Sequence, residues 1–367
     1  MKIILVVGAR PNFMKVAPLV AQLRLPGSRH TPVVVHTGQH YDYGMSQVFF
    51  DELELQPPEH YLEARTDGPV LQMGDIMVKF NAVLDAESPD LVLVVGDVTS
   101  TVACALAAAA RDVPVAHVEA GLRSGDRRMP EEIHRMATDA VADMLFTHCA
   151  DADANLAAEN VPAHCVFRVG NLMIDTLHRF RPKAEASTVV ADWGLEEGQY
   201  VLVTLHRPSN VDDAEALAGI VGAFERIQER LPVAFLVHPR TRDRLERFGL
   251  QGRLDAMANL QQREPVGYVE MLRLQASARL VLVDSGGIQE ETTALGVPCL
   301  TMRENTERPV TITEGTNELV GADPQRIGDA ALAVLDGRAK PGRVPELWDG
   351  HSAERLCAVL DRGVVRR

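Results

Sequence analysis

The sequence of 367 residues lacks the features that would assign it to a membrane or to an extracellular compartment. No uninterrupted apolar run reaches the roughly 20 residues that a helix needs to span a bilayer. The five cysteines are odd in number and contain no C-x-x-C pair, which is typical of reduced thiols and predicts a cytoplasmic protein. Residues 1–8 contain an apolar stretch too short for the core of a signal peptide, so we expect a buried strand there.

The chain also lacks a positive charge balance and the glycine fingerprint of dinucleotide-binding proteins. Its formal net charge of −14 at pH 7 argues against nucleic-acid or anionic-membrane partners. An acidic protein can still bind a phosphorylated ligand, because helix N-termini and single arginines attract phosphate locally. The motif G-x-G-x-x-G is absent, so nothing in the sequence indicates a redox cofactor.

The sequence does contain an alternation of short apolar segments with amphipathic segments of helical length, which predicts parallel α/β architecture. In the first half, residues 13–23 place apolar side chains on one helical face, and Asn12 is the predicted N-cap. The strands predicted in this half are residues 3–7, 33–36, 91–95, 115–118, 144–147 and 166–169.

The alternation stops at residues 181–198, a polar stretch that we interpret as an interdomain linker followed by an entry segment of the second domain. It resumes with predicted strands at residues 200–205, 233–237, 260–263, 280–283 and 299–302. We therefore predict two Rossmann-like domains with parallel sheets, residues 1–180 and 181–351, with the active site in the cleft between them. A C-terminal helix within residues 352–367 is expected to pack back on the first domain.

Charged side chains of the first half stand where α/β proteins bind ligands. Arg10 and Lys15 flank the turn from the first strand into the first helix, where a phosphate can bind. Asp97 and Glu119 follow two consecutive strands, so both carboxylates are expected at one edge of the sheet. The alternatives are a tight turn with solvated cations, a helix cap at Asp97 and solvated loop acids.

A third carboxylate is predicted at the start of a helix, because Pro130 suits a first helical turn. Glu131 follows it, and Arg135 lies one turn further along the same helix. These two residues form either part of the site or an ordinary surface ion pair, which contributes only about 0.3–0.5 kcal/mol.

In the second half, His206 leaves a predicted strand and has the side chain best suited to proton transfer near neutral pH. A lone histidine is nevertheless more often structural, and His117 and His238 are given no catalytic role. Gly286 and Gly287 separate a strand from a helix predicted to start at residue 288, so they form either a cradle of backbone amides for phosphate or an ordinary turn. An arginine, Arg308, follows the last core strand.

Taken together and in this order, the motifs resemble the non-hydrolysing UDP-N-acetylglucosamine 2-epimerase family over nearly the whole chain. They are G-A-R-P, G-D-V-T-S-T, H-V-E-A-G-L-R-S-G-D, P-E-E-x-x-R, H-R-P-S-N, D-S-G-G-I-Q-E-E and E-R-P. The resemblance implies a glycosyltransferase-B-like fold, a homodimer, and interconversion of UDP-GlcNAc and UDP-ManNAc without a metal or cofactor. It also implies a supply of ManNAc for surface polysaccharides.

The resemblance implies a role for each matching residue. Those that match residues around UDP are Arg10, His206, Ser285, Gly286, Gly287, Glu291 and Arg308. Those that match residues around the reacting sugar are Lys15, Asp97, Glu119, Glu131 and His206, with Arg135 as a supporting arginine. Met271 stands where the family commonly has an aromatic side chain near the uracil. Gln39, His40 and Arg207 match a regulatory UDP-GlcNAc site of bacterial members, with Asp42 replacing a glutamine.

The implied reaction is an elimination of UDP followed by its re-addition. The hydrogen at C2 is not α to a carbonyl, so a carboxylate cannot remove it until the C1–O bond to UDP breaks. The scheme needs groups that bind the diphosphate and at least two acid–base groups around C2. A hydrolysing relative that releases ManNAc and UDP, an epimerase of a modified UDP-GlcNAc, a glycosyltransferase and a nucleotide-sugar sensor remain alternatives.

Overall fold

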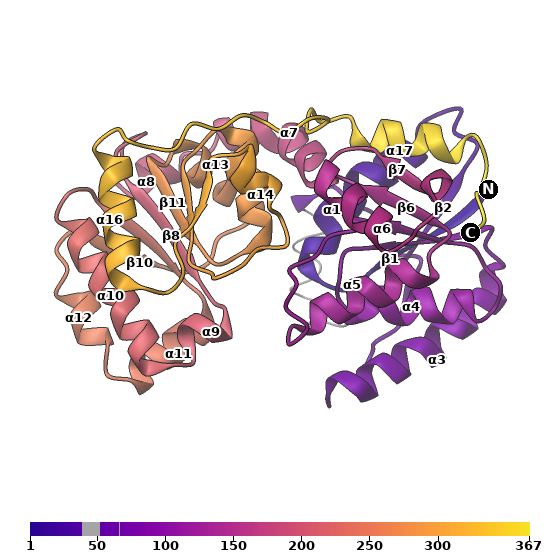
Figure 1. The fold of residues 1–367 in the computed structure, drawn as a ribbon, viewed down its shortest axis with the longest axis horizontal. Helices are drawn as coiled ribbons and strands as arrows, with labels where there is room; N and C mark the ends of the chain where they lie inside the picture. The colour runs from indigo at the N-terminus through magenta and orange to yellow at the C-terminus, as the bar shows by residue number, and fades with distance from the viewer. Residues whose placement is uncertain (39–51, 66) are drawn as a thin grey trace. The chain divides into compact units, whose positions relative to one another are not determined.

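The structure is a computed structural model, and it describes residues 1–38, 52–65 and 67–367 of the chain (Figure 1). Three residues that match the regulatory site of other members lie outside the described residues, namely Gln39, His40 and Asp42.

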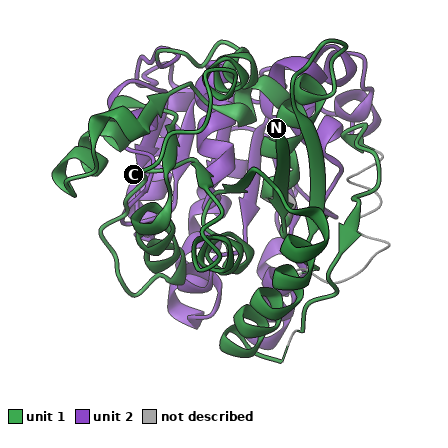
Figure 2. Ribbon diagram, turned by 90° about the vertical axis from the view of Figure 1, so that its right-hand side faces the viewer, with its two compact units in different colours: residues 1–176, 346–367 green, residues 177–345 purple. Residues whose placement is uncertain are grey.

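Two compact units make up the fold, and Figure 2 colours them green and purple. Unit 1 comprises Met1–Thr176 and Glu346–Arg367, and unit 2 comprises Leu177–Pro345. Both boundaries fall a few residues before the predicted ones. Helix α17 (Ser352–Leu360) belongs to unit 1, where it packs against α1 (Arg10–Leu23).

A seven-stranded parallel sheet forms the centre of unit 1, in the order β3-β2-β1-β4-β5-β6-β7. The strand order reverses between β1 and β4, and sheets of this type bind ligands at that switch point. Its strands are β1 (Lys2–Val7), β2 (Thr31–His36), β3 (His60–Tyr61), β4 (Leu91–Val95), β5 (Val115–Val118), β6 (Met144–Thr147) and β7 (Val166–Arg168). Its other helices are α3 (Pro69–Glu87), α4 (Thr99–Ala109), α5 (Pro130–Val141), α6 (Ala150–Ala158) and the 3-10 turn Ala163–Cys165.

A six-stranded parallel sheet forms the centre of unit 2, in the order β10-β9-β8-β11-β12-β13. Here the order reverses between β8 and β11. Its strands are β8 (Val201–Leu205), β9 (Val233–Val237), β10 (Leu260–Arg263), β11 (Leu280–Val283), β12 (Cys299–Thr301) and β13 (Asn317–Leu319). Its helices that follow β8 are α9 (Pro208–Val211), α10 (Ala214–Gln228), α11 (Pro239–Arg247), α12 (Gln251–Asp255), α13 (Tyr268–Ser277), α14 (Gly286–Leu295), α15 (Val310–Thr313) and α16 (Pro324–Leu335).

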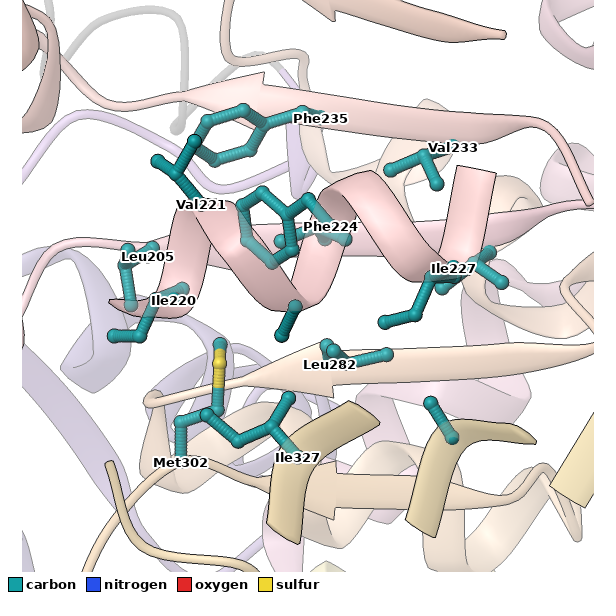
Figure 3. Packing of buried hydrophobic residues seen from close by; sticks show 14 of the residues in the cluster. Leu205, Ile220, Val221, Phe224, Ile227, Val233, Phe235, Leu282, Met302 and Ile327 are labelled. Carbon is teal, nitrogen blue, oxygen red and sulfur yellow. The ribbon is translucent and has the colours of Figure 1, made fainter. Parts of the chain in front are cut away.

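The core of unit 2 shows why apolar segments of this sequence form buried strands. Along β8, Val203 and Leu205 pack into one core cluster, whereas Leu202 packs into the cluster on the opposite face, as the two-residue period of a strand requires. Helix α10 covers the first face, and Figure 3 shows its Phe224 beside Phe235 of β9. Their ring centroids lie 5.4 Å apart at an interplanar angle of 65°, a T-shaped contact.

The predicted fold class of two parallel-sheet α/β units is confirmed, and the predicted interdomain linker is wrong. Helix α7 (Leu172–Glu185) runs through the first part of residues 181–198, and α8 (Val189–Asp192) follows it. The reason is that Leu177, Phe180 and Ala184 are buried at helical spacing, so an apolar stripe continues beneath the polar residues.

The predicted N-cap of the first helix is also wrong. Helix α1 begins at Arg10 with Ala9 as its N-cap, and Asn12 lies inside the first turn. Oδ1 of Asn12 accepts a hydrogen bond from the backbone N–H of Ala9 at 3.0 Å. Its Nδ2 donates to the carbonyl of Val95 at 2.9 Å. Asn12 therefore ties the start of α1 to the end of β4, across the switch point.

Candidate active site

A buried ion pair occupies the switch point of unit 1. Lys15 of α1 donates from Nζ to Oε2 of Glu119, and the two side chains are only 6% and 5% exposed. Glu119 follows β5 with a φ of 66°, a left-handed conformation that is uncommon and strained outside glycine. Its Oε1 is buried and has no hydrogen-bond partner in the part of the chain that the structure describes. A buried acceptor in a strained loop at a switch point is typical of a site that receives a ligand.

Asp97 lies close to this ion pair, because it follows Gly96 at the end of β4, the strand next to β5. A Cβ atom on Gly96 would lie 3.4 Å from both Lys15 Nζ and Glu119 Oε2, so the turn before Asp97 adjoins the ion pair. The N-cap of α4 is Val98, which excludes the helix-cap alternative for Asp97. The Asp97 side chain is 26% exposed and accepts a hydrogen bond from Nη1 of Arg135.

Arg135 is the residue that organises the start of α5, and only 1% of its side chain is exposed. It donates from Nη1 to Asp97 and from Nη2 to Oε2 of Glu132 at 2.7 Å. Burial raises the pKa of Glu132, but hydrogen bonds from Ser124 and from Arg135 outweigh it and lower the pKa overall. Arg135 therefore does not form the ion pair with Glu131 that we considered, because a buried carboxylate one residue further along holds it instead.

Glu131 lies in the first turn of α5 and is half-buried. Among the described residues, no ion pair or side-chain hydrogen bond satisfies its carboxylate. The start of α5 is joined to the Asp97 turn, since His134 Nδ1 donates to the backbone carbonyl of Asp97 at 2.9 Å. The three predicted acids thus differ in their partners: Asp97 pairs with an arginine, Glu119 pairs with a lysine, and Glu131 pairs with neither.

A second buried network supports the ends of β4 and β5. His117 of β5 is fully buried, with Nδ1 2.6 Å from Oδ1 of Asp139 and Nε2 2.9 Å from the carbonyl oxygen of Gly96. Asp139 also accepts a hydrogen bond from the backbone N–H of Gly121 at 3.0 Å. Burial raises the pKa of Asp139, but the charges of His117 and Arg123 lower it below its usual value.

The site residues of unit 2 also lie at a switch point, between β8 and β11. His206 follows β8 and Asp284 follows β11, and His206 Nδ1 lies 2.9 Å from Asp284 Oδ1. The His206 side chain is 40% exposed, whereas Asp284 is fully buried. The ring of His238 stands 5.5 Å from the ring of His206, measured between centroids. Burial, and then the neighbouring His206, lower the pKa of His238.

The two glycines occupy the first turn of α14 instead of a loop before it, which corrects the predicted helix start. Ser285 is the N-cap, and the helix begins at Gly286. The first backbone N–H groups of a helix have no intrahelical acceptor, so the predicted amide cradle becomes a helix N-terminus. A Cβ atom at Gly286 would lie 2.6 Å from Arg308 Nη1 and 2.9 Å from Glu307 Oε1. The glycine is therefore needed for the close approach of this arginine.

Arg308 belongs to a buried cluster of alternating charges. Its Nε lies 3.0 Å from Oε1 of Glu290, and its Nη1 donates to Glu307. Glu307 also accepts from Arg303 at 2.8 Å. All four side chains are at most 7% exposed. Two carboxylates thus fix the Arg308 guanidinium beside the first turn of α14.

Two further predicted residues lie deeper in unit 2. Glu291 of α14 is buried and accepts a hydrogen bond from Gln275 at 2.8 Å. Burial, together with the adjacent Glu291 carboxylate, raises the pKa of Tyr268 well above its usual value. Met271 is half-buried on α13 and packs against the apolar cluster on one face of the sheet.

Sequence reasoning missed the carboxylates that hold the predicted site residues. They are Glu132, Asp139, Asp284, Glu290 and Glu307. The only local signal was adjacency in the sequence. Four of these carboxylates stand next to a predicted site residue in a quoted motif, namely Glu132, Asp284, Glu290 and Glu307. Within the described ranges, no group of three or more histidines, cysteines, aspartates or glutamates is arranged to hold a metal ion. No helix in these ranges is long and apolar enough to cross a membrane.

Comparison with solved structures first defines the class of fold. A glycosyltransferase from Rickettsia africae aligns with a TM-score of 0.56 at 11% identity, covering 99% of both chains, so this chain shares the glycosyltransferase-B-like fold. The crystal structure of Methanocaldococcus jannaschii UDP-GlcNAc 2-epimerase in complex with UDP-GlcNAc and UDP aligns much better. Its TM-score is 0.90 at 38% identity, over 99% of this chain and 100% of that chain.

Sequence comparison then gives the family. The family model described as UDP-N-acetylglucosamine 2-epimerase matches residues 26–361. A UDP-N-acetylglucosamine 2-epimerase homolog of Methanococcus maripaludis is 42% identical over 98% of this chain and 99% of its own length. A UDP-2,3-diacetamido-2,3-dideoxy-D-glucuronate 2-epimerase of Pseudomonas aeruginosa is 41% identical over 91% of this chain and 92% of its own length. The chain belongs to the UDP-N-acetylglucosamine 2-epimerase family.

Proposed function

We propose that the chain is a non-hydrolysing epimerase that interconverts UDP-GlcNAc and UDP-ManNAc by elimination and re-addition of UDP through a glycal. The observation that carries the proposal is the pair of carboxylates at the switch point of unit 1. Glu119 is held by Lys15 and has one buried oxygen without a hydrogen-bond partner among the described residues, and Asp97 is held by Arg135 beside it. The complex of the M. jannaschii relative with UDP-GlcNAc and UDP supports a UDP-sugar as substrate.

The UDP part is assigned to unit 2. The N-terminal amides of α14, at Gly286 and Gly287, bind an anion through their N–H groups and the helix dipole. His206 and Arg308 are assigned charge-assisted hydrogen bonds to the diphosphate. The resemblance to the family assigns Arg10 to UDP as well. These groups stabilise UDP as it leaves with the electron pair of the C1–O bond.

Ser285, Glu291 and Met271 complete the assignment of the nucleotide part. Ser285 is the N-cap of α14 and stands next to the glycine amides. Glu291 lies one turn further along the helix, where a hydrogen bond from Gln275 fixes its carboxylate. We assign this carboxylate to the sugar hydroxyls of the nucleotide. Met271 is assigned to the uracil.

The proton chemistry is assigned to the three acids of unit 1. As the C1–O bond breaks, C1 becomes cationic and the C2 proton becomes acidic enough for a carboxylate to remove. A proton returned to the opposite face of C2, with re-addition of UDP at C1, gives the epimer. Asp97, Glu119 and Glu131 are the candidate acid–base groups, and two of them act on opposite faces of the sugar. Lys15 and Arg135 hold two of these carboxylates in place through ion pairs.

Incubation of the protein with UDP-GlcNAc in D2O, followed by NMR of the products, tests this proposal. We expect UDP-ManNAc and UDP-GlcNAc that both carry deuterium at C2, without added metal or NAD. Free ManNAc in amounts equal to UDP would instead assign the chain to the hydrolysing class. Transfer of the sugar to an acceptor, or binding without any deuterium exchange, would contradict epimerisation altogether.

A modified UDP-GlcNAc is the alternative substrate, and the P. aeruginosa relative that acts on a diacetamido-glucuronate motivates it. The same assay with UDP-2,3-diacetamido-2,3-dideoxy-D-glucuronate separates the two. A higher kcat/KM for UDP-GlcNAc supports our choice, and a higher value for the diacetamido sugar would replace it.

We also assign the enzyme to the cytoplasm as a homodimer that supplies ManNAc units for surface polysaccharides. All five cysteines are free and buried, which suits a reducing compartment. Helix α3 carries an exposed apolar face on unit 1, where Val70, Leu71 and Val78 are 81%, 51% and 73% exposed. An apolar face of this kind is typical of a surface that a second copy covers.

A further inference from the structure

The two oxygens of the Asp284 carboxylate have different surroundings. Oδ2 accepts three hydrogen bonds, whereas Oδ1 lies against one side chain, that of His206. Oδ2 accepts from the backbone N–H of His206 at 2.9 Å, from that of Arg207 at 2.7 Å, and from Nδ2 of Asn210 at 3.2 Å. Oδ1 lies 2.9 Å from Nδ1 of His206 as an ion-pair contact, and among the described residues no hydrogen bond satisfies it. Asp284 is fully buried, so water cannot substitute for any of these partners.

This arrangement determines which ring nitrogen of His206 carries the proton. Burial raises the pKa of Asp284, but the hydrogen bond and charge of His206 and the backbone N–H groups lower it below its usual value. A carboxylate oxygen can only accept, and this one is buried, unsatisfied and 2.9 Å from Nδ1 of His206, so the contact favours a proton on Nδ1. Nε2 has no hydrogen-bond partner among the described residues, and the side chain is 40% exposed.

The groups around the His206 ring favour this state. His238 is the neighbouring titratable side chain, and its Nδ1 accepts a hydrogen bond from the backbone N–H of Arg240 at 3.2 Å. Burial, and then the nearby His206, lower the pKa of His238, so it stays neutral and does not repel a proton on His206. The guanidinium of Arg207 is turned to the backbone carbonyl of Asp284, to which its Nε donates at 3.1 Å.

We propose that Asp284 is a positioning residue that fixes His206 in the Nδ1–H tautomer and leaves Nε2 as the atom that exchanges a proton with the substrate. The inference rests on the proposed function of His206 at the diphosphate. Neutral His206 then presents a lone pair at Nε2. Once Nε2 has taken up a proton from solvent water, Asp284 stabilises the resulting imidazolium. The ring then donates this proton to a phosphate oxygen of UDP as the C1–O bond breaks, and it returns to the neutral Nδ1–H form.

The substitution Asp284→Asn tests the inference because the three donors to Oδ2 dictate how the amide must turn. The carbonyl oxygen of asparagine has to occupy the Oδ2 position, so its NH2 group faces His206 Nδ1. The ring must then accept at Nδ1 and carry its proton at Nε2, which is the opposite tautomer. The change in shape is minimal, so the substitution alters the proton position more than the packing.

Nitrogen-15 NMR of the imidazole rings at alkaline pH, where the rings are neutral, reads the tautomer directly. The His206 signals are assigned by their absence from the His206→Ala spectrum. We expect Nδ1–H in the wild type and Nε2–H in Asp284→Asn, with turnover reduced roughly 100-fold, the low end for acid–base groups, and a nearly unchanged KM. An Nε2–H tautomer in the wild type overturns the inference, even if Asp284→Asn does not fold.

Two comparisons separate positioning from a structural role. Asn210→Ser removes another partner of Asp284 without altering the tautomer, so its turnover should stay close to wild type. In the His206→Ala background, Asp284→Asn should cause no further loss of turnover, because its effect passes through the missing ring. A loss of turnover in Asn210→Ser equal to that in Asp284→Asn would contradict the inference. So would the full loss from Asp284→Asn in the His206→Ala background. The tautomer spectrum needs no substrate, so it remains decisive even if the D2O assay refutes the proposed reaction.

Discussion

The substitution Glu119→Gln should destabilise unit 1 as well as abolish turnover. It leaves the Lys15 ammonium buried without a counter-charge, since this lysine is 6% exposed and Glu119 is its ion-pair partner. Removing one partner of a buried ion pair costs about 3–5 kcal/mol. Because a glutamine oxygen can still accept a hydrogen bond from Lys15, we expect the lower value, about 3 kcal/mol. The sequence alone led to a different expectation, namely that replacing Asp97, Glu119 or Glu131 by its amide leaves the Tm almost unchanged.

Differential scanning calorimetry measures this effect. For a unit of roughly 150–250 residues, each kcal/mol moves the Tm by about 2–4 °C, so Glu119→Gln should lower it by roughly 6–12 °C. The double variant Lys15→Met/Glu119→Gln is the matched control, because it removes the uncompensated charge, and it should recover most of the loss in Tm but none of the turnover. A Tm within about 1 °C of wild type for the single variant would refute the reasoning.

Three further predictions follow from the partners of individual side chains. Glu131→Gln should lower turnover by at least about 100-fold without changing the Tm, since Glu131 has no ion-pair partner among the described residues; steady-state kinetics and melting curves measure both. The lowered pKa of Asp139 means that its contribution to stability is present above its unfolded pKa of about 3.9 and is lost as the pH falls through the lower folded value. The free energy of unfolding measured in urea should therefore fall less steeply with decreasing pH in Asp139→Asn than in the wild type. Val78→Glu should convert a dimer to a monomer in size-exclusion chromatography with light scattering while Tm stays within about 2 °C, because this side chain is 73% exposed.

The sheets could be predicted from the sequence because a strand buried on both faces is a nearly continuous apolar run. Residues 91–95, 115–118 and 280–283 are such runs, and each forms the strand predicted for it. The two strands that the prediction missed lie at the edges of the sheets, where burial is incomplete. β3 is only His60–Tyr61, and β13 is Asn317–Leu319, so neither presents an apolar run.

The positions of the candidate acids were also accessible from sequence, whereas their partners were not. A residue that follows a parallel strand must lie at the carboxyl edge of the sheet, which is why Asp97 and Glu119 stand at the switch point. The cations that hold them come from distant parts of the chain: Lys15 is 104 residues from Glu119, and Arg135 is 38 residues from Asp97. Local spacing favoured Glu131 as the partner of Arg135, and burial selected Glu132 instead.

The ion pairs of Arg308 in unit 2 change how its positive charge can act on a ligand. Counted from the sequence, Arg308 is a free cation for a diphosphate, but Glu290 and Glu307 hold it, and Arg303 balances the cluster with a second positive charge. These four side chains carry two positive and two negative charges. Oriented dipoles therefore add to the attraction for a diphosphate in this unit, because the N–H groups at the start of α14 have no intrahelical acceptors. An arginine fixed by two carboxylates supplies direction more than net charge, because Glu290 and Glu307 hold its guanidinium in one orientation.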